Sequence, residues 1–236
     1  MTAARPHSGA LSEEAEPVVL AEETDAPLAG AVVTDILAVA TREFAQHGLA
    51  GARIERIQAQ TRTSKRMIYY HFGSKEGLYR AVLDHAFETV RAVDQGFDPE
   101  ASSPEQALRS IARNAFTAFM RNPDFARLLT FENLAGAPYI RDSQQVARFN
   151  RKALQDMQRV LERGLHDGSF REEVQALDVY LNIVGLCYYH VAHQAAIRSG
   201  SLDASVTEGH LGTGFHQQRQ RAIEEATWRY VKADRF

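Results

Sequence analysis

The chain has 236 residues, of which 44% are hydrophobic, and this is enough to bury a full core as one large domain or two small ones. Its formal net charge of −3 and its single cysteine exclude a chain that is basic throughout and a disulfide-rich scaffold. No apolar run approaches the roughly 18 residues of a membrane span, and residues 1–10 lack the apolar core of a secretory signal. We therefore expect a soluble, cytoplasmic protein.

Charge is distributed unevenly along the chain. Residues 1–30 hold one basic and six acidic residues and few large apolar ones, so we expect them to form a disordered acidic tail. Residues 31–80 hold eight basic and four acidic residues, whereas the remainder is mildly acidic. A basic block inside an acidic chain indicates one region that meets a polyanion, with a simple solvated face as the alternative.

From Ala31 onward, apolar residues recur with helical spacing and no segment alternates as a strand does, which predicts an all-α fold. Gly48, Ser74 and the Ser103-Pro104 pair are typical helix ends and starts. We expect a three-helix head at 31–75 and, at 76–236, a body that begins with a connecting helix. The expected helices span residues 31–47, 54–60, 64–71, 75–95, 103 to the break at 122–123, 123–132, 143–164, 178–199 and 215–232.

Two short helices joined by a tight turn, at residues 54–71, are the arrangement that presents an α-helix to the major groove of DNA. Ile57, Ile68 and Phe72 are expected in the core. Cationic side chains neutralise phosphates, and hydroxyl and imidazole groups can donate to them. A solvated helical hairpin with a buried aromatic pair is the alternative. The candidate residues between Arg53 and Lys75 are Arg53, Glu55, Arg56, Arg62, Ser64, Lys65, Arg66, Tyr69, Tyr70, His71 and Lys75.

The run SKRMIYYHFGSKEGLY at residues 64–79 resembles the recognition helix and following turn of TetR/AcrR-family regulators. The segment FAQHG at residues 44–48 resembles the end of that family's first helix, and the likeness covers about residues 33–83. The resemblance implies a ligand-responsive, DNA-binding transcription regulator. The simplest form is a repressor that a small-molecule inducer releases from a palindromic operator, with no enzymatic activity and no cofactor.

The resemblance also implies a role for individual head residues. Tyr69, His71 and Lys75 meet phosphates. Lys65, Arg66 and Tyr70 lie nearest base edges, and an Arg or Lys contact to guanine is the strongest sequence-reading contact. Glu55 reaches across from the preceding helix. The predicted DNA-binding set is Arg53, Glu55, Ser64, Lys65, Arg66, Tyr69, Tyr70, His71 and Lys75.

Three positions depart from the family pattern. Arg62 replaces a glycine of the turn, where a positive φ is common. Gln58 stands where a small alanine is usual, and Arg53 stands where threonine or serine often opens the helix. We expect these changes to affect the docking angle and the operator sequence, but not the fold.

In this family the last two long helices pair with their symmetry mates as a four-helix bundle, and segments 178–199 and 215–232 both carry broad apolar faces. A homodimer presents two recognition helices about 34–36 Å apart, which matches a palindromic operator. An intramolecular core is the alternative for these faces. The apolar residues concerned are Val184, Cys187, Tyr188, Val191, Ile223, Trp228 and Val231.

A pocket for the small-molecule effector is expected among the body helices. Residues 127–138 are thinly similar to a segment of a subgroup that includes pyrimidine-utilisation repressors, which does not identify the ligand. Each candidate pocket residue could instead be ordinary core or a dimer contact. The candidates are Phe116, Phe119, Phe131, Asn133, Tyr188, Tyr189, His190 and His193.

Three rival functions remain open. An enzyme could use Cys187 beside a histidine, but the sequence has no nucleophile elbow or phosphate-binding glycine loop, and a buried structural thiol explains this cysteine. A metal site could use His190 and His193, with His210 and His216 further on, but no cysteine or carboxylate pattern accompanies them. A protein-interaction scaffold could use the acidic tail, but it leaves the basic helix without a role.

Overall fold

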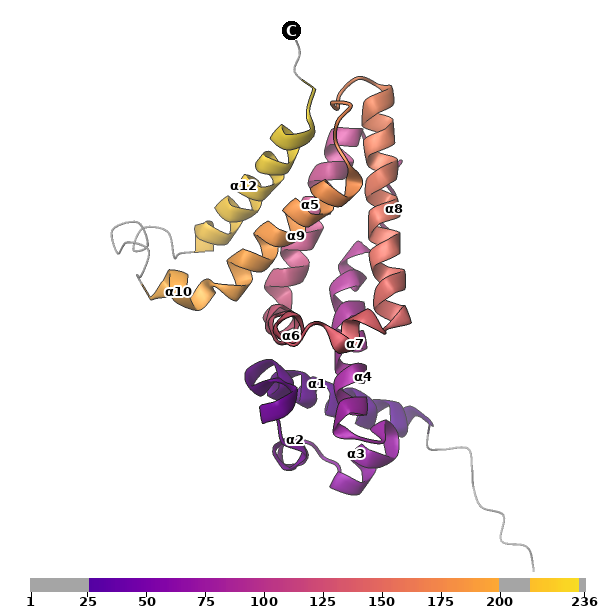
Figure 1. Cartoon of the computed structure of the whole chain (residues 1–236), viewed down its shortest axis with the longest axis vertical. Coiled ribbons are helices and arrows are strands. Elements are labelled where there is room, and N and C mark those ends of the chain that lie inside the picture. Colours follow the sequence, from indigo (N-terminus) through magenta and orange to yellow (C-terminus); the bar gives the residue numbers. More distant parts are fainter. Residues whose placement is uncertain (1–25, 200–212, 234–236) are drawn as a thin grey trace, which may run out of the picture.

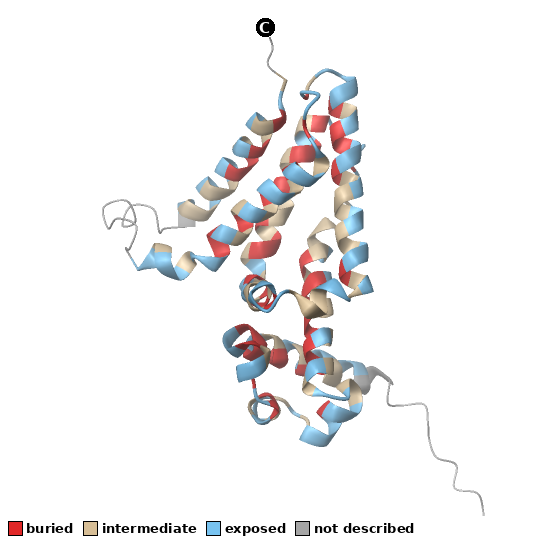
Figure 2. Ribbon diagram, viewed as in Figure 1, coloured by how far each residue is buried: buried red, intermediate tan, exposed pale blue. Residues whose placement is uncertain are grey.

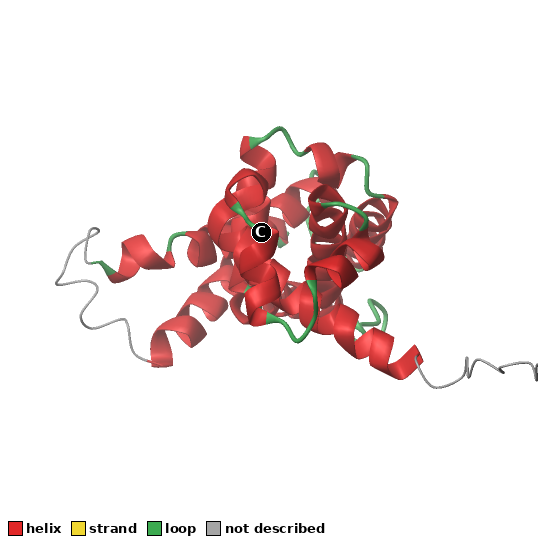
Figure 3. Ribbon diagram, turned by 90° about the horizontal axis from the view of Figure 1, so that it is seen from below, coloured by secondary structure: helices red, strands yellow, loops and turns green. Residues whose placement is uncertain are grey.

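The computed structural model describes residues 26–199 and 213–233, which form an elongated helical molecule (Figure 1). These residues form helices joined by short connections (Figure 3), apart from an isolated antiparallel bridge between Phe170 and Lys232. The predicted all-α fold is confirmed. Most of the expected acidic tail lies outside the described residues, and the first helix begins at Ala26, earlier than the predicted Ala31. None of the described helices is both long enough and apolar enough to cross a membrane.

The head comprises α1 (Ala26–Gly51), α2 (Ile54–Gln60), α3 (Lys65–Phe72) and the first turns of α4 (Lys75–Arg91), at the lower end of Figure 1. The predicted serine cap of α4 is confirmed, because the Ser74 side chain accepts the Gly77 N–H at 2.9 Å.

The body comprises the rest of α4, the 3₁₀ turn η1 and the later helices, which lie above the head in Figure 1. The predicted helix over 178–199 is wrong as one element. It is divided at His193, whose ring stacks on Tyr189 at 4.0 Å and whose backbone leaves the helical region. The segment predicted as the end of α4 is η1, and α7 was not predicted. The body elements are η1 (Ala92–Asp94), α5 (Pro104–Arg121), α6 (Pro123–Leu134), α7 (Pro138–Arg141), α8 (Gln144–His166), α9 (Ala176–Ala192), α10 (Gln194–Arg198) and α12 (Thr213–Val231).

The buried residues form one continuous core through the head and the body (Figure 2). Ile57 and Ile68 are buried as predicted, whereas Phe72 is only partly buried against the core. Tyr79 on α4 is fully buried, and its ring meets Phe44 of α1 edge to face at 5.0 Å. The beginning of α4 is thereby fixed to the head.

The junction between head and body is formed by α1 and α4 against α6 and α7. Gly48 ends the regular part of α1 with a φ of 62°, and a side chain there would come within 2.9 Å of the Phe131 ring of α6. Glu132, which is buried, accepts the backbone N–H groups of Tyr139 and Ile140 at 3.1 and 3.2 Å. The Glu132 carboxylate also accepts a hydrogen bond from the Tyr79 hydroxyl. This carboxylate connects α6 to α7 and to the head end of α4.

Candidate DNA-binding surface and effector cavity

The two faces of α3 have opposite environments. Ile68 is 1% exposed, whereas Tyr70, two residues further on, is 78% exposed. Ser64 caps the helix by accepting the Met67 N–H at 3.2 Å, which fixes where α3 begins. Arg66 is exposed as well. The helix, which lies at the lower end of the molecule (Figure 1), therefore exposes cationic and aromatic residues.

Lys65 and Glu55 form an exposed ion pair between α3 and α2, with Nζ and Oε1 2.6 Å apart. The hydrogen bond lowers the pKa of Glu55 and raises that of Lys65. Both residues belong to the predicted DNA-binding set, and both lie at the predicted surface. In this structure, however, they bind each other, so one of the three N–H donors of Lys65 is engaged by a carboxylate.

Arg56 lies in the same basic segment but serves the internal structure of the head. Its Nε donates to the buried Glu43 carboxylate at 2.7 Å, and the Arg53 backbone N–H donates to the same oxygen at 2.9 Å. Burial alone raises the pKa of Glu43, but these hydrogen bonds and the Arg56 charge lower it below its ordinary value. Glu43 thus holds the start of α2 against α1, and spacing along the sequence did not reveal this contact.

The predicted phosphate contacts differ in how freely they face solvent. Tyr69 is 39% exposed, and the Lys75 Nζ lies 3.5 Å from the Ala50 carbonyl at the end of α1. His71 is partly buried, and its Nε2 is fully buried with no hydrogen-bond partner among the described residues. This nitrogen is not presented to a phosphate in the structure. Arg53 is exposed at the start of α2.

The turn between α2 and α3 accommodates Arg62 at the position where the family usually has glycine. Ala137 is the one non-glycine residue with a positive φ in the described ranges, so Arg62 keeps an ordinary backbone conformation. The Arg62 N–H donates to the Asp35 carboxylate of α1 at 3.2 Å. A side chain at this position is therefore compatible with the turn.

A cavity of about 220 Å³ lies in the body, enclosed by α4, α5, α6, α8 and α9. Two of the eight predicted pocket residues, Phe119 and Asn133, line it. Arg91, Asp94 and Tyr180 also line it, and sequence reasoning missed them. One signal was available, because Arg91 continues the four-residue spacing of the apolar stripe of α4, where a charged residue is out of place.

The other predicted pocket residues lie elsewhere. Phe131 packs at the head–body junction, and Tyr188 hydrogen-bonds Thr130 across α9 and α6 at 2.6 Å. The Phe116 ring lies 5.5 Å from that of the buried His190, between α5 and α9. The remaining two form an exposed stack on α9 and at its end: Tyr189 and His193.

The rival enzymatic and metal sites gain no support from their surroundings. Cys187 is fully buried, and burial raises its pKa to about 12, so its thiol stays protonated. His190 Nε2 lies 3.4 Å from His216 Nδ1, and His193 lies apart on the surface. In the described ranges, no group of three or more His, Cys, Asp or Glu residues is arranged to hold a metal ion. His210 lies outside those ranges.

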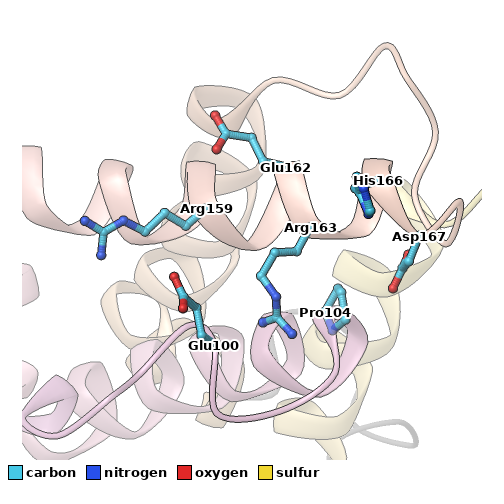
Figure 4. Close-up of a pocket in the computed structure, with 7 residues that line it drawn as sticks. All are labelled: Glu100, Pro104, Arg159, Glu162, Arg163, His166 and Asp167. Atoms are coloured by element: carbon cyan, nitrogen blue, oxygen red, sulfur yellow. The ribbon is translucent and has the colours of Figure 1, made fainter.

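A larger cleft of about 430 Å³ lies at the opposite end of the molecule from α3 (Figures 1 and 4). Its charges are mixed, and Arg163 is already engaged because it donates to the Pro99 and Ser102 carbonyls. That arginine holds the connection before α5 against α8. Acidic and basic side chains both line the cleft, so it does not favour a ligand of one charge. Its lining residues are Glu100, Pro104, Arg159, Glu162, Arg163, His166 and Asp167 (Figure 4).

Two family models match the chain: "Bacterial regulatory proteins, tetR family" at residues 36–82 and "Tetracyclin repressor-like, C-terminal domain" at residues 104–201. The transcriptional repressor NicS of Pseudomonas putida is 32% identical over 165 residues, which are 70% of this chain and 78% of that protein. The regulator RutR of Escherichia coli is 36% identical over 107 residues, 45% of this chain and 50% of RutR. The crystal structure of the regulator SCO4942 of Streptomyces coelicolor is similar at a TM-score of 0.60 and 26% identity, covering 85% of this chain and 98% of that one.

Proposed function

The chain belongs to the TetR family of bacterial regulatory proteins, and we propose that it acts as a homodimeric repressor released from a palindromic operator by a small-molecule effector. As a member of this family it is a DNA-binding transcription regulator and not an enzyme. The observation that carries the proposal is the outer face of α3, where Arg66 and Tyr70 are exposed on a helix that is anchored in the head by Ile68.

Within the proposed DNA contact, some residues bind base edges and others bind phosphates. Arg66 has no intramolecular partner among the described residues and is free to bind a guanine edge in the major groove. Tyr69 and Lys75, at the outer edges of the helix-turn-helix, contact phosphates. Lys65 joins the contact when DNA replaces Glu55 as its partner.

Dimerisation through α9 and α12 is supported by what these helices leave exposed. The faces that contain Cys187 and Ile223 are buried within the protomer, so those residues belong to the intramolecular core. A different stripe remains open on α9, where Leu177, Leu181 and Tyr189 are 51%, 55% and 54% exposed at multiples of four residues. Exposed leucines aligned on one helix face are the pattern expected of a protein interface. On the neighbouring α12 the exposed residues include Ala222 and Ala226, which allow close approach.

Communication between effector and DNA is proposed to run through α4. This helix starts at Lys75 in the head, and its last turn, with Phe87 and Arg91, lines the body cavity. A ligand that binds one position of α4 more tightly than another shifts the spacing of the two heads and lowers operator affinity by its differential affinity. We accordingly divide the chain into a DNA-binding domain at residues 31–75 and an effector-binding and dimerisation domain at residues 76–236.

Binding to a randomised duplex library tests the function. Selected duplexes are expected to be palindromic and are then used in fluorescence anisotropy. Arg66→Ala should relax the preference at one position in each half-site, whereas Lys75→Ala should weaken binding to all sequences and reduce the salt slope by about one. Arg159→Ala, on α8, is the control and should change neither. Equal weakening of all sequences by Arg66→Ala would contradict its base-reading role, and failure of the protein to bind any duplex at low salt would contradict the function.

The dimer interface is tested by light scattering after chromatography. Leu181→Asp should convert the dimer to a monomer and abolish tight operator binding, because a charge would be buried at the centre of the proposed interface. Leu165→Asp replaces a leucine that is 37% exposed on α8, and it should remain dimeric. A dimeric Leu181→Asp protein would move the interface away from α9.

A further inference from the structure

The body cavity has an apolar wall that is built largely from aromatic rings. The Phe87 and Phe125 rings meet edge to face at 4.9 Å, and the Phe119 ring lies 5.5 Å from Phe125. Leu129 and Val184 extend this surface from α6 and α9. An aromatic corner of this kind favours a flat ring or a short apolar body over a flexible polar one.

The other end of the cavity is polar and is organised around one cation. The Arg91 Nη2 donates to the Tyr180 hydroxyl at 2.8 Å, and the guanidinium lies 5.7 Å above the Tyr180 ring. The Tyr180 hydroxyl in turn lies 3.4 Å from Asn150 Oδ1. These contacts from α8 and α9 fix the arginine at the edge of a mostly apolar space.

The Arg91 guanidinium is only loosely paired at this end of the cavity. Its ion-pair partner Asp94 lies 3.6 Å from Nη1, and 21% of the Arg91 side chain remains exposed. The Arg91 Nε has no acceptor among the described residues, but this atom is fully buried and does not face the cavity. Burial raises the pKa of Asp94 above its ordinary value, although Arg91 and Asn114 oppose this change. A guanidinium cannot give up its proton, so its permanent charge favours an anionic acceptor.

An outer cleft of about 280 Å³ leads to the same group. It opens between the end of α4 and α8, and it shares Arg91 and Asp94 with the inner cavity. Lys152 also lines this cleft, where it pairs with Asp156 at 2.7 Å. Arg91 and Asp94 therefore separate the outer cleft from the aromatic wall of the cavity.

The size of the inner cavity limits the occupant. The cavity volume is about 220 Å³. Pockets for drug-sized ligands begin at about 300 Å³. The space therefore suits a single ring with one small substituent, or an aliphatic body of similar size.

We propose that the effector of this regulator is a compact carboxylate, whose anionic group binds Arg91 and whose single ring or similarly small apolar body lies against Phe87 and Phe119. The inference rests on the proposed function, because it names the ligand class of the same cavity. A carboxylate matches the guanidinium in charge and geometry. A primary amine places a like charge beside Arg91, and a neutral amide supplies an acceptor without the charge.

Calorimetric titration of the full-length protein without DNA tests the inference, with benzoate, benzamide and benzylamine as probes of one shape. Benzoate should bind roughly 10-fold to 100-fold more tightly than benzamide, which is the range for a hydrogen bond to a charged group, and benzylamine should not bind. Arg91→Met should remove this advantage, whereas benzamide, which loses only a hydrogen bond to a neutral acceptor, should lose much less affinity. Arg91→Lys keeps the charge without the planar fork and should give an intermediate affinity. Arg159→Met, which alters a wall of the cleft in Figure 4, is the matched control.

Three results would overturn the inference: equal affinity for benzoate and benzamide, no binding of either at millimolar concentration, or an equal loss in Arg91→Met and Arg159→Met. If Arg91→Met does not fold, the relative affinities of the three probes for the unaltered protein still test whether the cavity prefers a carboxylate. Operator binding is measured separately by anisotropy, and ligand-free Arg91→Met should bind the operator like the unaltered protein. Failure of the unaltered protein to bind DNA rejects the proposed function, whatever the calorimetry shows.

Discussion

The head and the body differ in the polar side chains that they expose and bury. In the head, cationic and aromatic groups of α3 are exposed, and the Lys65–Glu55 pair bridges α2 and α3 at the surface. Among the described residues the head buries one carboxylate, Glu43, whereas the body buries Glu132, Glu224 and His190. The difference supports the proposed division, in which the head binds an external partner and the body surrounds a ligand. It also predicts that substitution of the buried polar residues of the body costs more stability than substitution of the exposed polar residues of the head.

The largest effect is expected at Glu132, which connects the two regions. Glu132→Ala leaves the partly buried N–H groups of Tyr139 and Ile140, and the Tyr79 hydroxyl, without their acceptor. At roughly 1–3 kcal/mol for each unsatisfied group, the free energy of unfolding should fall by about 3–5 kcal/mol, as measured by urea denaturation. Glu132→Gln keeps one acceptor oxygen and should lose less. A loss below about 1 kcal/mol for Glu132→Ala would show that solvent replaces the carboxylate.

The next effect concerns pH and His190 in the body. Burial, together with the nearby His216, Arg219 and Arg198, lowers the pKa of His190 from 6.5 to about 4. Between these values the unfolded chain binds a proton that the folded protein excludes, so stability should fall as the pH decreases from 6.5 to about 4. The full effect is up to about 3 kcal/mol.

Denaturation at a series of pH values measures this effect. His190→Gln should flatten the dependence in that window, whereas His166→Gln, an exposed residue of α8, should leave it unchanged. If His190→Gln keeps the same slope as the unaltered protein, another group is responsible for it.

A smaller effect is expected at Gly48, where the head meets the body. Gly48→Ala introduces a side chain at a φ of 62° and against the Phe131 ring, and we expect a loss of about 1–2 kcal/mol in unfolding free energy. Gly73→Ala is the matched control, because its φ is 72° but the space around it is open. Thermal unfolding should show the larger loss for Gly48→Ala, and equal losses would mean that the Phe131 contact relaxes freely.

The smallest change in stability is expected for Glu55→Gln on the surface of the head. Its pair with Lys65 is exposed, so the unfolding free energy should not change measurably. Operator affinity should rise a few-fold at low salt, because Lys65 is released and a negative charge near the phosphates is removed. Anisotropy measures this rise, with Glu88→Gln of the distal half of α4 as the control. Weaker binding would instead show that the Glu55 carboxylate itself contacts DNA, as the family resemblance implies.

The amino-acid sequence predicted the head more completely than the body. In the head, helix spacing and capping serines predicted α2, α3 and the start of α4 to within a residue or two, and Arg66, Tyr69 and Tyr70 are exposed as expected. In the body, the long helices were predicted, but α7 and the break between α9 and α10 were not. Of the predicted cavity residues, Phe119 and Asn133 line the cavity, whereas Tyr189 lies on the surface.

The sequence by itself determined the helical fold and the displayed face of α3, because both depend on local spacing: a residue's neighbours three or four positions away decide whether it joins the core or faces solvent. Only the tertiary structure decided that Arg56 binds Glu43, that Phe131 packs on Gly48, and that Arg91 and Tyr180 share one cavity. These pairs lie on different helices, and their contact depends on how the helices cross, which no local pattern specifies.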